Sequence, residues 1–204
     1  PCLAVLPVWP PVASVSPLAL YIHIPFCAAK CDYCAFHSLP ATSLKGMREV
    51  VHTINNQIAG LSIALSRCET IYVGGGTPTI LPMEGQGGLC ELLRTIAATI
   101  PNHTELTVEA NPRSIDDRTL GGLADAGVTR LSLGVQSLDP AALAVLGRAG
   151  TTREHLAWIR ARWPHQLAFD VLHAIPGVGM ESEIGTLDAL LPLGPDHLAV
   201  YDLT

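Results

Sequence analysis

Short apolar runs alternate along the chain with longer segments in which apolar residues recur at helical spacing. The short runs are rich in aliphatic and β-branched residues, a composition that favours strands. The sequence predicts six strands, at Leu20–Ile24, Thr70–Val73, Leu106–Ala110, Arg130–Val135, Ala168–Leu172 and Leu198–Leu203. It predicts five helical segments between them, at Leu44–Ser66, Gly88–Ile100, Asp116–Ala126, Pro140–Arg162 and Glu181–Leu191.

This repeated alternation of strand and helix predicts right-handed βαβ units and a parallel sheet. The fold class is therefore α/β, and the sheet is either open and doubly wound or part of a (β/α) barrel. In a barrel, the chemistry lies at the carboxyl ends of the strands. Polar residues and glycines follow five of the predicted strands, at Cys27, Gly74–Thr77, Glu109–Asn111, Gln136 and His173–Gly177. We expect these positions to form one site.

Composition limits the classes of function. Of the 204 residues 49% are hydrophobic and only 15% are charged, which argues against disorder. The net charge of −6 argues against binding driven by nucleic-acid phosphates. The chain carries no Asp, Glu, Lys or Arg before Lys30, but its many prolines there argue against a membrane span, and the basic start of a secretion signal is lacking. We expect an extended Pro-rich leader at 1–16, a core domain at 17–204 and a cytoplasmic location.

Three of the six cysteines form a compact motif. Cys27, Cys31 and Cys34 follow the spacing C-x3-C-x2-C on one predicted loop. A structural zinc site normally needs four protein ligands, and His37 could supply the fourth. A four-iron cluster held by only three cysteines would leave one iron open to a substrate chelate. The residues alone leave both interpretations open.

Two further features indicate chemistry near the strand ends. Glu109 lies in an otherwise apolar strand, where a carboxylate is costly unless it has a partner. A buried salt bridge to Arg130 or Arg148 is the structural alternative to a binding role. The glycines of Gly74–Thr77 either form a tight turn or let a ligand approach the backbone, where amides can bind charged groups.

Six ordered segments together resemble one known family. They are YIHIPFCAAKCDYC, IYVGGGTPTIL, LTVEANP, GVTRLSLGVQSLD with LGR, FDVLHAIPG and LGPDHLAVYDLT. The cysteine spacing is the signature of the radical S-adenosylmethionine (SAM) superfamily, and the whole set resembles its anaerobic coproporphyrinogen III oxidase-like group. The resemblance runs from Leu18 to Thr204 and implies a partial (β/α)6 TIM-like barrel of parallel strands. Members of this group continue beyond the sixth strand, so we expect their C-terminal region to be missing here.

The group has two branches, and one residue bears on the choice between them. Its oxidases resemble C-x3-C-x2-C-x-C, whereas Phe36 stands at the place of that extra cysteine. The C-x-F ending resembles the heme chaperone (HemW) branch, although that branch usually has Asp where this chain has Ala35. The resemblance thus implies a protein that binds heme and passes it to target proteins. The alternative is an oxygen-independent coproporphyrinogen III dehydrogenase, which decarboxylates two propionates.

The resemblance also implies cofactors, partners and site residues. Cys27, Cys31 and Cys34 would hold a 4Fe-4S cluster that gives an electron to SAM. The residues matching SAM contacts are Tyr21, Tyr33, Gly75, Gly76, Thr77, Glu109, Gln136, Arg148 and Asp170. The implied partners are SAM, heme or a porphyrin, heme-recipient proteins and an electron donor such as flavodoxin or ferredoxin, with no nucleic acid and no membrane span. His23 and His173 are expected to face the site, more as structural histidines than as heme ligands.

Overall fold

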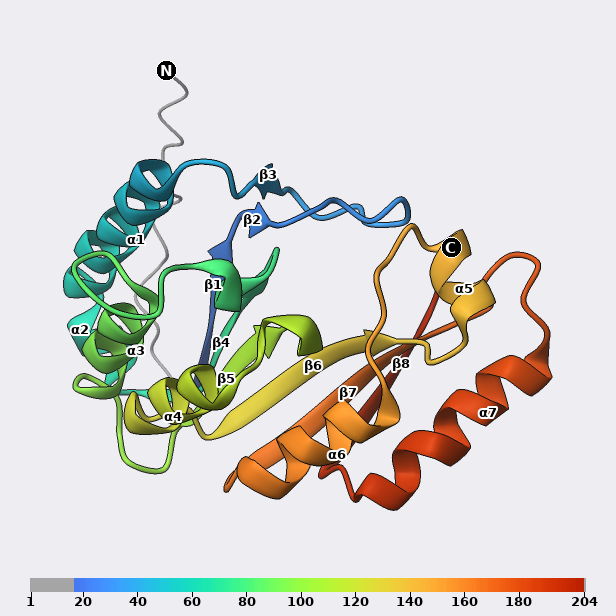
Figure 1. The fold of residues 1–204 in the computed structure, drawn as a ribbon. Helices are drawn as coiled ribbons and strands as arrows, with labels where there is room; N and C mark the ends of the chain where they lie inside the picture. Colours follow the sequence, from blue (N-terminus) through green and yellow to red (C-terminus); the bar gives the residue numbers. More distant parts are fainter. Residues whose placement is uncertain (1–16, 204) are drawn as a thin grey trace.

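The computed structural model describes residues 17–203, apart from the side chains of residues 62 and 63, and consists of one curved parallel sheet covered by helices on one face (Figure 1). The sheet order is β1-β4-β5-β6-β7-β8, so each strand after β4 lies beside the one before it. These strands span Leu18–Ile24, Cys68–Gly75, Glu105–Ala110, Arg130–Gln136, Gln166–His173 and His197–Asp202. The predicted leader at 1–16 lies outside the described residues.

Helices connect successive strands of the large sheet. The α-helices are α1 (Leu44–Ala59), α2 (Ser62–Leu65), α3 (Leu89–Ala97), α4 (Asp117–Asp125), α5 (Pro140–Val145), α6 (Arg153–Arg162) and α7 (Met180–Leu190). Short 3-10 helices are η1 (Pro78–Ile80), η2 (Pro112–Ser114) and η3 (Leu191–Leu193), and a small second sheet pairs β2 (Phe26–Cys27) with β3 (Leu39–Pro40). No helix within residues 17–203 is long and apolar enough to cross a membrane.

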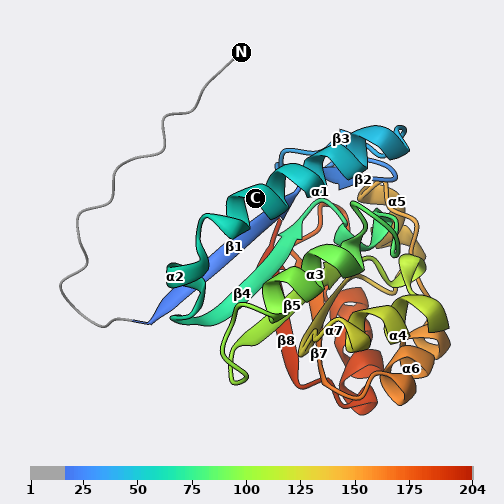
Figure 2. The same cartoon turned by 90° about the vertical axis from the view of Figure 1, so that its left-hand side faces the viewer.

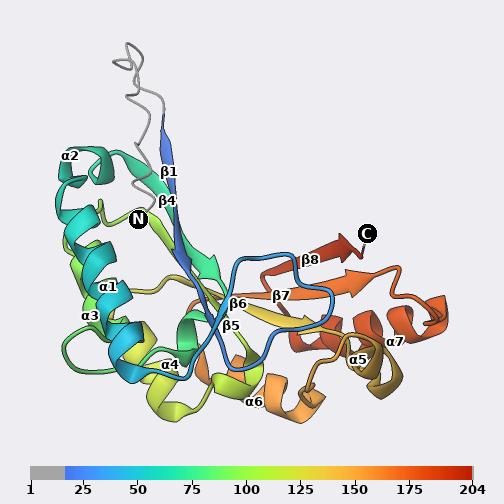
Figure 3. The ribbon, with the colours of Figure 1, turned by 90° about the horizontal axis from the view of Figure 1, so that it is seen from above.

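The sheet curls into a half-barrel, which confirms the predicted partial barrel. Seen from above in Figure 3, the helices lie along the convex side of the sheet, and the concave side opens between β1 and β8. Figure 2 shows the same stacking from the side, with α1 and α3 outside β1 and β4. The core lies between the convex face and the helices, where Ile71, Leu133 and Phe169 are fully buried against residues such as Leu92 and Ile159.

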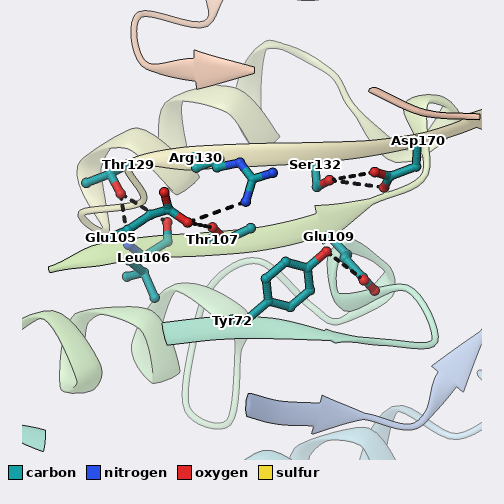
Figure 4. A network of polar contacts seen from close by, with 9 residues as sticks. All are labelled: Tyr72, Glu105, Leu106, Thr107, Glu109, Thr129, Arg130, Ser132 and Asp170. Carbon is teal, nitrogen blue, oxygen red and sulfur yellow. Dashed lines mark hydrogen bonds and ion pairs between the residues drawn. The ribbon is translucent and has the colours of Figure 1, made fainter. Parts of the chain in front are cut away.

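Alternation along each strand places polar residues on the opposite, concave face. Side chains of a strand point to the two faces in turn, so the positions between the core residues point away from the helices. Ser132 lies between Leu131 and Leu133, and Asp170 lies between Phe169 and Val171. Figure 4 shows these side chains with others of the inner face. The concave face is therefore where the polar chemistry of the strands is collected.

Two predicted helices are wrong in extent. Leu44–Ser66 is interrupted at Gly60, which ends α1 before the short α2. Pro140–Arg162 is two helices, because Gly147 has φ 60°, a left-handed conformation that ends α5 and starts a turn. Thr152 then caps α6 by accepting a hydrogen bond from the amide of His155. The apolar spacing continued through this break, so periodicity alone did not reveal it.

Capping residues and glycines mark the ends of several other helices. Asp139 caps α5, and Gly127, with φ 86°, follows the end of α4. The cap of α4 is Asp116, whereas Ser114 is a turn residue within η2. Gly194 ends η3 in the left-handed conformation. Strands β2 and β3 were not predicted, since two-residue strands leave no periodic pattern.

Candidate functional site

A cavity of about 810 Å³ lies at the carboxyl ends of the strands. Nearly all predicted site residues line it, namely Cys27, Cys31, Tyr33, Cys34, Gly75, Gly76, Thr77, Glu109, Gln136, Arg148 and Asp170. They meet because the carboxyl ends of parallel strands open at the same rim. Residues more than a hundred positions apart in the sequence therefore share one wall. Four of the five predicted strand ends contribute to this wall, whereas residues 173–177 do not line the cavity.

The three cysteines come from the loop between β2 and β3, here called the cysteine loop (residues 27–38). The pairing of Phe26 with Leu39 and of Cys27 with Pro40 closes the base of this loop. All three thiols are free and partly exposed. Within residues 17–203 no three His, Cys, Asp or Glu side chains are gathered closely enough to hold an ion, so the thiols share the wall without converging on one point.

The donor set of the loop fits an iron–sulfur cluster better than a closed zinc site. Thiolates are the standard ligands of such clusters, and three of them line the same cavity. His37 was the candidate fourth zinc ligand. It does not line this cavity, and its main-chain carbonyl is within hydrogen-bond distance, 2.9 Å, of His23 Nε2. The cavity beside the thiols offers room for a further ligand.

Glu109 is held by two hydrogen-bond donors of its own neighbourhood. The Tyr72 hydroxyl donates to Oε1 at 2.8 Å (Figure 4). The Gly75 amide donates to Oε2 at 2.9 Å. Burial raises the pKa of Glu109, and these two hydrogen bonds act against that rise. The structural alternative, a salt bridge to Arg130 or Arg148, does not form, since Arg130 pairs with Glu105 at 3.4 Å and Arg148 donates to Gly134 and Cys31. Among residues 17–203, Glu109 is thus a partly desolvated carboxylate in the cavity wall without a direct ion pair.

The glycine run is required by the packing of the protein itself. A Cβ atom on Gly74 would lie 2.7 Å from the Glu109 carboxyl, and one on Gly75 would lie 2.5 Å from the His23 ring. A Cβ atom on Gly76 would lie 2.3 Å from the carbonyl oxygen of Phe26. Gly75 also has φ 112°, which L residues rarely adopt. The tight-turn explanation therefore accounts for these glycines without a ligand.

The amides of this run are engaged within the protein, as the tight-turn alternative implies. In addition to the Gly75 hydrogen bond, the Gly76 amide donates to the Ile24 carbonyl at 2.8 Å and the Thr77 amide donates to the Phe26 carbonyl at 2.7 Å. A ligand group at this wall would instead have to act as a donor. An ammonium group is such a donor, and carbonyl oxygens or the Glu109 carboxylate would accept from it.

Asp170 is the second half-buried carboxylate of the wall. The Ser132 hydroxyl lies 3.0 and 3.2 Å from its two oxygens (Figure 4). Burial raises the pKa of Asp170, and the hydrogen bond from Ser132 opposes this rise most strongly. Its remaining acceptor capacity faces the cavity. A carboxylate in this setting is suited to accepting from ligand hydroxyls.

Gln136 and Arg148 also line the cavity. Gln136 has φ 67° at a register shift in β6, a strained conformation for a non-glycine residue that is common at functional sites. The guanidinium of Arg148 donates to the Gly134 carbonyl and, at 3.5 Å, to the Cys31 sulfur. A ligand carboxylate placed in this cavity would find its cationic partner here.

The two predicted tyrosines have different positions. Tyr33 lines the cavity, and burial raises its pKa to about 12. Tyr21 does not line it. Its ring stacks on Tyr72 with 6.1 Å between centroids, and its hydroxyl lies 3.3 Å from His23 Nδ1. Tyr21 thus contacts Tyr72, which holds Glu109, and does not itself line the cavity.

The histidines named from the sequence are structural in this arrangement, and neither His23 nor His173 lines the cavity. His173 lies 2.8 Å from a carboxylate oxygen of Glu183 and 3.5 Å from one of Asp202. The hydrogen bond with Glu183 raises the pKa of His173. The expectation that these two imidazoles face the site is therefore wrong.

Sequence reasoning missed several cavity residues. Phe36, Lys30, Arg113 and Tyr201 also line the cavity. Tyr201 follows the same rule as the predicted residues, since it lies near the carboxyl end of the last strand. Lys30 and Arg113 add positive charge at loops that follow strands, a signal visible in the sequence but not used. Phe36 was noted only for the cysteine that it replaces.

Comparisons with known proteins agree with this geometry. The family model described as the Radical SAM superfamily matches residues 21–190. Heme chaperone HemW of Escherichia coli (strain K12) is 35% identical over 205 residues, covering 95% of this chain and 52% of that protein. Oxygen-independent coproporphyrinogen III oxidase of Paracoccus denitrificans is 30% identical over 196 residues, covering 90% of this chain and 42% of that protein.

A solved structure shares the fold. Coproporphyrinogen III oxidase (HemN) from Escherichia coli, described as a radical SAM enzyme, aligns with a TM-score of 0.79 at 24% identity. The alignment covers 92% of this chain and 44% of that one. The chain therefore spans about half the length of the relatives that it matches.

Proposed function

Because the chain belongs to the radical SAM superfamily, we propose that it holds a 4Fe-4S cluster on Cys27, Cys31 and Cys34 and binds SAM beside it. The observation that carries this proposal is the shared cavity, which brings three thiols of one loop together with two half-buried carboxylates and an arginine. A cluster of this kind supplies one-electron reduction of the SAM sulfonium when it is bound.

The side chains of the cavity have the properties to hold SAM in one orientation. Arg148 is the cation for the methionyl carboxylate, and Glu109 accepts from the methionyl ammonium. Asp170 accepts from the ribose hydroxyls, with Ser132 holding its carboxylate in place. Placed at three separate points of the wall, these groups fix the ligand and limit the entry of water.

Reconstitution tests this proposal. Wild-type protein is incubated anaerobically with iron and sulfide, assayed for bound iron, and examined after reduction by electron paramagnetic resonance with and without SAM. We expect cluster-bound iron and a signal that changes when SAM is added. Cys31→Ala should lose the iron, whereas Cys68→Ala, a buried thiol outside the cavity, should keep it. Wild-type protein that takes up zinc but no iron would contradict the proposal.

Within the family, we propose a heme chaperone that binds heme and transfers it to recipient proteins. Phe36 supports this choice, since it lines the cavity where the oxidases carry a further cysteine. SAM, heme or a porphyrin, a recipient protein and a flavodoxin- or ferredoxin-type electron donor would be its partners, and a reducing compartment such as the cytoplasm suits its free thiols. Residues 17–204 would form the radical SAM core domain.

The oxidase alternative is favoured by the similarity to the Paracoccus denitrificans protein, and one assay separates the two. Reconstituted protein is supplied with coproporphyrinogen III, SAM and a reductant, and a parallel sample is titrated with heme. We expect saturable heme binding without decarboxylation. Formation of protoporphyrinogen would refute the chaperone assignment and favour the dehydrogenase.

A further inference from the structure

The cysteine loop contacts a turn that comes from a distant part of the sequence. This turn, residues 146–148, follows α5, and in Figure 1 the loop reaches from β2 across the top of the sheet toward α5. The amide of Asp32 donates to the carbonyl of Leu146 at 3.4 Å. The guanidinium of Arg148 donates to the Cys31 sulfur at 3.5 Å. Two neighbouring residues of the loop are thus tied to the same turn.

Gly147 makes this close approach possible. A Cβ atom at this position would lie 2.5 Å from Oδ2 and 2.8 Å from Cγ of Asp32. The Asp32 carboxylate therefore occupies the space that any other residue at 147 would need. Gly147 also has φ 60°, which turns the chain back after α5 and directs Leu146 and Arg148 toward the loop.

The turn is itself firmly anchored. Leu146 is buried in a small apolar cluster with Ala142, Leu172 and Ile175, and Tyr33 of the cysteine loop packs against this cluster. The second guanidinium nitrogen of Arg148 donates to the carbonyl of Gly134 in β6. The turn thus connects α5, the sheet and the cysteine loop, and a shift of the turn would be transmitted to the thiols.

We propose that the 146–148 turn is the docking platform of the cysteine loop, and that Gly147 is a positioning residue for the three thiols. The proposal rests on the proposed function of this loop as the cluster site. The loop is held at its base by the two-residue strands β2 and β3 and by the contact of the His37 carbonyl with His23. Without contacts near its tip, it would have to be ordered when the ligand binds, at the cost of conformational entropy. Docking on the turn orders the loop when the chain folds, before any ligand binds.

Hydrogen exchange of the metal-free protein tests the docking directly, since it reports local opening. Gly147→Ala should speed exchange at the Asp32 and Tyr33 amides by roughly tenfold, the ratio that corresponds to a loss of about 1.4 kcal/mol in the free energy of loop docking. Gly177→Ala is the matched control. Gly177 also has positive φ, 75°, but a Cβ atom there would meet nothing within 4 Å. In Gly177→Ala, the Asp32 and Tyr33 amides should exchange at the wild-type rate.

A second substitution separates the contact with Asp32 from backbone strain. In the double variant Gly147→Ala/Asp32→Ala, the clashing carboxylate is removed while the left-handed backbone remains, so exchange should return most of the way to wild type. Arg148→Met removes the side-chain contacts of the turn without straining its backbone, and it should also speed exchange in the loop. It keeps the test open if Gly147→Ala fails to fold.

The outcomes distinguish this proposal from the assignment of the cluster. Equal loop exchange in Gly147→Ala and Gly177→Ala would overturn the docking platform, as would a double variant no better protected than Gly147→Ala. After reconstitution, iron content should fall in Gly147→Ala and stay high in Gly177→Ala. If the wild type binds no iron, the cluster assignment fails, while the exchange rates of the metal-free chain still decide whether the turn holds the loop.

Discussion

The pair formed by Ser132 and Asp170 allows a quantitative test of how the concave face tolerates a buried charge. Ser132 is 1% exposed, and its hydroxyl donates to the Asp170 carboxylate. A hydrogen bond to a charged group contributes about 1.5–3 kcal/mol, compared with about 0.5–1.5 kcal/mol for a neutral pair. Ser132→Ala should therefore lower the free energy of unfolding by about 1.5–3 kcal/mol at neutral pH, a Tm loss of roughly 3–12 °C at this chain length.

The size of this loss should depend on pH in a defined direction. Burial raises the pKa of Asp170 above its ordinary value of 3.8, so the folded protein takes up a proton more readily than the unfolded chain. As pH falls from neutral through the native pKa toward 3.8, the penalty for the buried charge disappears and folding is favoured. Once Asp170 is protonated, Ser132 bonds a neutral group, and the effect of Ser132→Ala should shrink to about 1 kcal/mol.

Denaturant unfolding followed by circular dichroism, at neutral pH and near pH 4, measures both values. Ser137→Ala is the control, since Ser137 is equally buried but bonds the neutral Thr186 hydroxyl, and its cost should hardly change with pH. In the background of Asp170→Asn, the pH dependence of Ser132→Ala should vanish. A loss that is the same at both pH values, or a control that varies as strongly, would refute this account of the buried carboxylate.

Three further predictions concern packing and titration. Gly76→Ala should lower the free energy of unfolding, measured by denaturant titration, by about 1–3 kcal/mol because the added Cβ would clash with the Phe26 carbonyl. In the same assay Gly121→Ala should raise the free energy of unfolding by roughly 0.5–1 kcal/mol, since a Cβ there would meet no atom within 4 Å and alanine favours the helix. Phe169→Ala should cost about 3–5 kcal/mol in the same assay, since this ring is fully buried, and a loss below that of a typical surface change would contradict its place in the core. The His173 ring, titrated by nuclear magnetic resonance, should have a pKa above 6.5 that falls back in Glu183→Gln, and an unchanged midpoint would show that the two side chains do not interact in solution.

The strands were predictable from the sequence because each has a face buried against the helices and therefore appears as a short apolar run. Ile71, Leu133 and Phe169 lie in apolar runs that only a covered parallel sheet explains, and all three are in the core. The helix that the sequence extended from Pro140 to Arg162 shows the limit of this reasoning. Its apolar spacing continued across Gly147, where the left-handed backbone ends α5 and separates it from α6.

The candidate site divides in the same way. Its membership followed from the sequence, since polar residues after successive strands must meet at one rim of a parallel sheet. The partners within it did not follow. The sequence offered a salt bridge as one alternative for Glu109, but Tyr72 and Gly75 donate hydrogen bonds to it instead. It left open whether the glycine amides face a ligand, and they donate to neighbouring carbonyls or to Glu109. Such choices depend on side-chain directions that spacing does not specify.

By itself, the sequence determined the order of strands and helices, the parallel α/β class and the loop that carries three cysteines, because these depend on local periodicity and on motifs that are continuous in the chain. Only the tertiary structure decided that Asp32 rests on Gly147, that Arg148 reaches Cys31, and that Tyr21 stays outside the cavity. These contacts join residues that are up to 117 positions apart, and their geometry depends on how the sheet curls and how each connection turns.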